Sequence, residues 1–202
     1  SKEKTPLNPS APKPSRSPGA SAEEAAVVVS QQISIAVQHH QAGRLSEAEA
    51  AWREALAADP ENNDILHLSG IIAYQLRKYE QAAELISLTL SRNASNAPAQ
   101  HDLGNVFLAQ GRLVEAIACY RRALALQPEF PEAQYKLGNA LKDQGEQDGA
   151  IACYRRALAL KPDFPEVYVN FGNVLNDQGK PHDAIACYQR AITLSPGFPD
   201  AH

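Results

Sequence analysis

The sequence predicts an all-α protein in which helical hairpins stack one upon the next into a solenoid. The segment AIACYRRALAL occupies residues 116–126 and returns unchanged at 150–160, and a near-copy, AIACYQRAITL, occupies 184–194. The copies begin 34 residues apart, a period typical of stacked helix–turn–helix units. Ala and Leu are abundant throughout, and no stretch alternates apolar and polar residues as a strand would.

Composition and charge set the broad class. The chain has 202 residues, 44% of them hydrophobic, and a net charge of −4, which suits a soluble protein with its own core. Its apolar stretches are too short to cross a membrane, and its first residues hold no apolar run of the secretory kind. Three cysteines in helical contexts, an odd number, argue against a disulfide framework. We therefore expect a cytoplasmic protein.

Residues 1–20 form a leader with a composition of its own. Five prolines, several serines and only Leu7 as a large hydrophobic residue predict a disordered or extended segment. Four cations against Glu3 give the leader a net charge of +3, which leaves −7 for the remainder. An acidic body disfavours nucleic acid, and scattered cations without an apolar face disfavour a membrane. We expect neither as a partner.

The helical part, 21–198, is expected to begin at Ser21, which fits a capping box with Glu24. Five units then follow in register, and residues 199–202 open a sixth. We call the five units repeats 1 to 5: 29–62, 63–96, 97–130, 131–164 and 165–198. Each is expected to form one hairpin of two helices.

The same residues mark the same places in each repeat. Glycine holds position eight in four repeats and alanine holds position twenty in all five, so that the two helices can approach closely. Glycine at position fifteen fits the left-handed residue that ends a helix before a tight turn, and Arg77 replaces it in repeat 2. Proline near the end of a repeat stops the second helix, and Phe-Pro pairs begin the next unit.

The second helix of each repeat presents one apolar face. Ala116, Tyr120, Ala123 and Leu124 fall at helical spacing. The place of Tyr120 is taken in the other repeats by Trp52, Ile86, Tyr154 and Tyr188. A single hairpin cannot cover such a face alone, so neighbouring hairpins must stack.

A unit with Leu-Gly, then Ala, then Tyr, Ala-Leu and Pro resembles the tetratricopeptide repeat over about residues 29–198. The resemblance implies a right-handed solenoid whose first helices line a concave groove for a protein or an extended peptide. LGNVFLAQGR, LGNALKDQGE and FGNVLNDQGK are further similar to the repeat array of the O-linked N-acetylglucosamine transferase family. That similarity implies asparagines that hold a peptide, and a glycosyltransferase domain outside this chain.

The candidate groove residues lie on the expected first helices. They are Asn105, Asn139, Asn170, Asn173, Tyr135, Lys136, Lys142, Asp143, Asn176 and Asp177. Three of the asparagines share position nine, and Asn170 matches the ladder position of the similar family, where repeats 3 and 4 have Asp102 and Lys136. An amide can pair with a peptide backbone, or it can instead join neighbouring helices. The sequence leaves both roles open.

No catalytic set, metal site or cofactor site is expected. Cys119, Cys153 and Cys187 recur at one position, where neighbouring helices are too far apart for a disulfide, and are expected to be small buried residues. His67 and His101 share a position in adjacent repeats, without further ligands at metal-binding spacing. Whether the parent protein is an enzyme therefore stays open.

Three functions remain in view from the sequence. The first is a scaffold that binds a protein or peptide in its groove, as the N-terminal part of a longer protein. The second is the substrate-recruiting arm of a glycosyltransferase whose catalytic domain lies elsewhere. The third is a scaffold that assembles with itself through the uncapped last repeat, because the chain stops four residues into a sixth unit.

Overall fold

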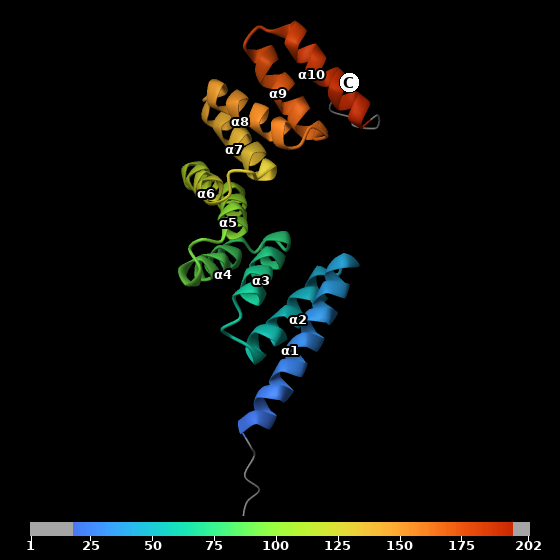
Figure 1. Cartoon of the computed structure of the whole chain (residues 1–202), viewed down its shortest axis with the longest axis vertical. Helices are drawn as coiled ribbons and strands as arrows, with labels where there is room; N and C mark the ends of the chain where they lie inside the picture. Colours follow the sequence, from blue (N-terminus) through green and yellow to red (C-terminus); the bar gives the residue numbers. More distant parts are fainter. Residues whose placement is uncertain (1–17, 196–202) are drawn as a thin grey trace, which may run out of the picture.

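The computed structural model describes the backbone of residues 18–195 and the side chains of residues 26–195. Within that part of the chain, ten helices account for all regular structure, and they form five antiparallel hairpins. Figure 1 shows the hairpins following one another along a curved path. The all-α solenoid expected from the repeats is confirmed.

The helices pair in chain order, one hairpin to a repeat. Their bounds are α1 (Pro18–Gln41), α2 (Leu45–Ala58), α3 (Asn63–Gln75), α4 (Tyr79–Arg92), α5 (Ala97–Ala109), α6 (Leu113–Leu126), α7 (Pro131–Gln144), α8 (Gln147–Leu160), α9 (Pro165–Asp177) and α10 (Pro181–Leu194).

The first helix begins earlier than the capping box predicts. Helix α1 starts at Pro18, so Ser21 lies inside the helix and is not its N-cap. Proline fits the first helical turn, because its missing N–H would have no partner there. Most of the predicted leader, residues 1–17, lies outside the described residues, as do residues 196–202 with the start of the sixth unit.

The turn inside each hairpin uses the expected left-handed residue. Glycine at position fifteen has a φ between 71° and 90° in four repeats, at Gly43, Gly111, Gly145 and Gly179. Arg77 adopts the same conformation in repeat 2, with φ of 60°. A side chain there is strained, which makes this turn the least ideal of the five.

The junctions between repeats use two different chemistries. The side chain of Asn62 accepts a hydrogen bond from the N–H of Ile65 at 3.2 Å and caps α3, and Asn96 caps α5 in the same way. Helices α7 and α9 begin instead with Pro131 and Pro165. Both solutions stop the preceding chain from continuing its helix and set the entry angle of the next one.

A glycine under a large side chain joins the two helices of a repeat. A Cβ built on Gly138 would lie 2.6 Å from Cε1 of Tyr154, and Gly104 and Gly172 stand in the same relation to Tyr120 and Tyr188. Tyr154 is fully buried. The ring therefore occupies the space that any other residue at position eight would need.

We predict that Gly138→Ala destabilises the protein by about 1–3 kcal/mol, because the added methyl group overlaps the ring of Tyr154. The matched control is Gly149→Ala in the same repeat, where the closest atom to the new Cβ is the side-chain end of Leu141 at 3.2 Å and the next is Glu146 at 3.7 Å. There, better helix propensity should raise stability by up to about 1 kcal/mol. Urea unfolding followed by circular dichroism measures both, and equal effects would contradict the contact's importance.

Candidate functional site

The first helices of the repeats line the inner side of the curved stack. Helix α3 contacts α5, α5 contacts α7, and α7 contacts α9, in addition to the partner of each in its own hairpin. In a curved stack, the elements that approach one another most closely lie on the inside. We call the surface formed by α1, α3, α5, α7 and α9 the inner face (Figure 1).

The three in-register asparagines are bonded within their own repeats. The hydroxyl of Tyr120 donates to Oδ1 of Asn105 at 2.9 Å. Tyr154 donates to Asn139 and Tyr188 donates to Asn173, each at 2.8 Å. The oxygen of each amide thus joins the first helix to the second, which is the structural role that the sequence left open.

The same bond leaves the amide nitrogen available. Within the described residues, Nδ2 of Asn139 and Nδ2 of Asn173 donate to no other group, whereas Nδ2 of Asn105 lies 3.4 Å from Nδ1 of His101. Asn139 is half-buried and Asn173 is exposed. Burial raises the pKa of the Tyr154 hydroxyl well above its ordinary range, so that it remains a donor to Asn139.

A second set of hydrogen bonds joins neighbouring repeats along the inner face. The ring of His67 bonds Oδ2 of Asp102 through Nε2 at 2.9 Å, and Nδ2 of Asn170 donates to the hydroxyl of Tyr135 at 2.8 Å. Both pairs link position five of one repeat to position six of the next. The side chain of Asn170 is therefore bonded to the neighbouring repeat. Its amide nitrogen is less available to a ligand than the sequence pattern suggests.

The remaining predicted residues also lie on the inner helices. The Lys136 ammonium stands 5.8 Å from the centre of the Tyr135 ring, and Lys142 pairs with Asp143 at 3.6 Å. Asn176 and Asp177 are exposed in the last turn of α9. Charged side chains of both signs thus lie on these two helices.

Sequence reasoning missed the residues of repeat 2 that belong to the same surface. Leu68 is 39% exposed there, and Ile71 occupies position nine, where later repeats have asparagine. Val37 in repeat 1 is also apolar and 38% exposed. Comparing position nine along all five repeats would have found this change from apolar to amide.

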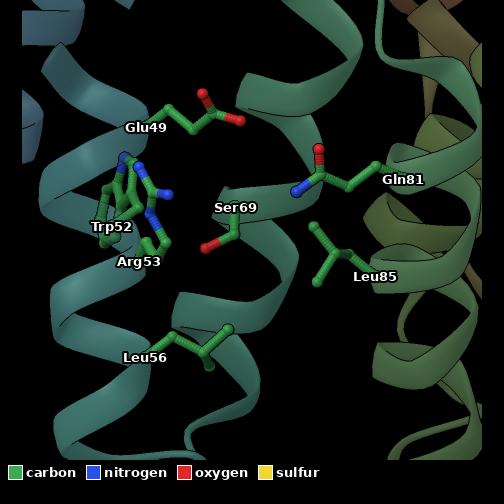
Figure 2. A pocket seen from close by; sticks show the side chains of 7 residues that line it. All are labelled: Glu49, Trp52, Arg53, Leu56, Ser69, Gln81 and Leu85. Atoms are coloured by element: carbon green, nitrogen blue, oxygen red, sulfur yellow. The ribbon is translucent and has the colours of Figure 1, made fainter. Parts of the chain in front are cut away.

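A hollow lies on the outer side of the stack, between α2, α3 and α4 (Figure 2). Its volume is about 100 Å³, and Trp52, Leu56 and Leu85 form its apolar walls. Ser69 points into it from α3, at a position where Leu103 and Leu137 stand in repeats 3 and 4. The hydroxyl of Ser69 donates to the carbonyl of Ile65 at 2.8 Å. Because serine is smaller than the leucine of repeats 3 and 4, it fills less of the space between the three helices.

The cysteines have the character of core residues. All three are free, Cys119 is buried, and Cys153 and Cys187 are half-buried. Burial raises the pKa of each thiol, which disfavours the reactive thiolate. Among residues 26–195, no group of three or more His, Cys, Asp or Glu side chains is arranged to hold a metal ion. No helix in the described part is long and apolar enough to span a bilayer.

We predict that Asn139→Ala destabilises the protein by about 1–3 kcal/mol, because the hydroxyl of the buried Tyr154 loses its acceptor. Tyr154→Phe in the Asn139→Ala background should recover part of this loss, since no orphaned hydroxyl then remains. The free energies of unfolding of the two single variants and the double variant give the coupling. Additive effects would show that the bond contributes nothing.

The chain matches known repeat families over most of its length. Residues 104–145, 138–179 and 172–202 each match the family described as TPR repeat, and residues 39–98 match the family described as Tetratricopeptide repeat. Human Tetratricopeptide repeat protein 7A is 30% identical over 89 residues, which make up 44% of this chain. The matched part is only 10% of the length of that protein.

Solved structures share the fold. The MamA protein is 25% identical, with a TM-score of 0.71 over 84% of this chain and 92% of its own. YrrB, described as a TPR protein with an unusual peptide-binding site, is 20% identical, with a TM-score of 0.69 over 89% of this chain and 96% of its own. Together with the five stacked hairpins, the family matches show that this chain belongs to the tetratricopeptide repeat family.

Proposed function

We propose that this chain is a protein-interaction scaffold whose inner face holds an extended segment of a partner protein. The observation that carries the proposal is the pair of amide donors on consecutive repeats, Nδ2 of Asn139 and Nδ2 of Asn173, each oriented by a tyrosine of its own repeat. A backbone carbonyl is the acceptor that such donors suit, whatever the side chains of the segment.

Preorganisation supports this function. Each amide is already fixed through its oxygen, so binding immobilises little that was free before. Lys136 and Lys142 add positive charge on α7, where Lys142 lies next to Asp143, so the surface offers polar contacts of both signs. YrrB, a fold relative, is itself described as having a peptide-binding site, which favours the same class of ligand.

The finer sequence predictions remain proposals. A place at the N-terminal part of a longer protein and a link to a glycosyltransferase both concern residues outside this chain. The matches to known families support the assignment of the repeats and no further domain or activity.

The test begins with selection of random linear twelve-residue peptides against the folded protein, followed by fluorescence anisotropy of the strongest binder. Lys136→Glu/Lys142→Glu should weaken binding by about tenfold, because it reverses two charges on the inner face. The matched control, Arg121→Glu/Arg156→Glu, reverses two exposed charges on the second helices and should change affinity less than twofold. Equal losses in both variants, or selection of no peptide, would contradict binding on the inner face.

A second candidate function is self-association through the last repeat. Ile185 is 51% exposed, whereas the equivalent Ile117 and Ile151 are 4% and 8% exposed under the next repeat. Tyr188 is also less covered than its counterparts Tyr120 and Tyr154. A second copy seated on this apolar end would bury both side chains.

We predict that the chain forms dimers whose dissociation depends on Ile185. Sedimentation velocity of this chain, residues 1–202, should show a mean mass that rises with concentration. Ile185→Glu should hold it monomeric, because a carboxylate cannot be buried unpaired in the contact. The control Val114→Glu alters an exposed apolar residue, 67% exposed, far from the last repeat and should leave the dimer intact. A monomer at all concentrations would exclude this function.

A further inference from the structure

Repeat 2 departs from the later repeats at two positions that face each other. Repeats 3, 4 and 5 pair an asparagine at position nine with a tyrosine at position twenty-four through a hydrogen bond. Repeat 2 has Ile71 and Ile86 at these positions. Both partners of the polar pair are replaced together, so that no donor or acceptor is left without its partner.

The replacement leaves a hollow on the inner face. Its volume is about 220 Å³, and it lies between α3 and α5. Its lining residues are Ile71, Tyr74, Gln75, Ile86, Asp102 and Asn105. Isoleucine is shorter than the tyrosine that reaches the inner face in repeats 3 to 5. Ile71, Tyr74 and Ile86 form the apolar part of the lining, and Gln75, Asp102 and Asn105 form the polar part.

The carboxylate at the rim is held in place by two histidines. Oδ2 of Asp102 is bonded to Nε2 of His67 at 2.9 Å, and Oδ1 to Nδ1 of His101 at 3.1 Å. Burial would raise the pKa of Asp102, but the hydrogen bonds from His101 and His67 and the attraction of these rings together hold it below the ordinary value. Asp102 is thus a carboxylate at neutral pH.

The charge of this carboxylate is not matched by a lysine or an arginine. In the described part of the chain, the ion-pair partners of Asp102 are His67 and His101 alone. Nε2 of His101 is buried without a hydrogen-bond partner, and the ring of His101 lies 5.1 Å from that of Phe130. No lysine or arginine of the described residues therefore competes with a ligand for this carboxylate.

We propose that this hollow is a side-chain pocket for a lysine or arginine of the segment held on the inner face. The proposal rests on the proposed function of that face and names the residue that the segment must carry. The aliphatic stem would lie against Ile71 and Tyr74, above the buried Ile86, and the cation would meet Asp102 at the rim.

Such a pocket would also set the register of the bound segment. The amides of repeats 4 and 5 pair with any backbone and do not distinguish one position of the segment from the next. Tyr120, Tyr154 and Tyr188 fill the equivalent space in repeats 3 to 5. A basic side chain of the segment, bound in the hollow of repeat 2, would therefore fix which residues of the segment face which repeat.

The test uses small probes and the full chain, labelled with ¹⁵N and observed by NMR at low salt. The probes are Nα-acetyl-lysine N-methylamide and its norleucine analogue, which has the same stem without the ammonium group. We expect both to shift the amide signals of Ile71, Tyr74 and Asn105 in a saturable way. The lysine probe should bind roughly three- to tenfold more tightly, as expected for a partly exposed ion pair.

Two variants and one control make the outcome decisive. Asp102→Asn keeps the shape of the rim and should remove the advantage of the lysine probe. Ile71→Asn/Ile86→Tyr restores the polar pair of the later repeats, and its ring should exclude both probes. The control Asp163→Asn changes an exposed carboxylate between α8 and α9, outside the candidate groove residues, and should leave both affinities unchanged.

Absence of saturable shifts at these residues, or a lysine advantage that survives Asp102→Asn, would overturn the pocket. Because the probes have no extended backbone, such a failure would leave binding of a segment elsewhere on the inner face untouched. Conversely, a functioning pocket in a protein that selects no linear peptide would overturn the proposed function alone.

Discussion

The contact between position eight and position twenty-four of a repeat determines how closely its two helices pack. Where the first helix has glycine, the ring of Tyr120 or Tyr154 comes so close that a Cβ would overlap it. The hydroxyl end of the ring reaches the inner face, where it bonds an asparagine of the first helix. The same contact recurs in repeats 3 to 5, and hairpins that pack in the same way can stack regularly.

The same tyrosine connects stability with recognition. Its body fills the space between the helices, and its hydroxyl fixes the amide of Asn139 or Asn173. The amide that would contact a ligand is therefore oriented by the residue that holds the hairpin together. A ligand that uses the free N–H group needs no rearrangement of the repeat, which agrees with a surface formed before binding.

Sequence periodicity predicts most of this architecture, because each recurring residue has one physical reason. Glycine at position fifteen is needed for a positive φ, and Gly111 and Gly145 have it. Periodicity shows which residues share a face, but not which polar atoms come within 3 Å. The bond between Tyr120 and Asn105, fifteen residues apart, needs the crossing of two helices to be known. The sequence also offers two signals for the start of α1, a proline suited to the first turn at Pro18 and a capping box at Ser21. The helix begins at Pro18, and the capping box gave the wrong start.

The pocket in repeat 2 was beyond reach of periodicity for a different reason. A repeat signal is read from residues that recur, whereas this hollow depends on Ile71 and Ile86, which do not. Replacing both members of a buried polar pair costs little, because neither is left unsatisfied, so such a change is tolerated by the fold. Repeat 2 also departs from the pattern in its turn, where Arg77 replaces glycine at a positive φ. This second departure costs stability, because the backbone there is strained for a residue with a side chain. Repeats 3 to 5 share the tyrosine–asparagine pair, so this pair cannot tell one position along the stack from another. A repeat in which both members are replaced can do so, and the departure of repeat 2 from the consensus then provides the proposed specificity.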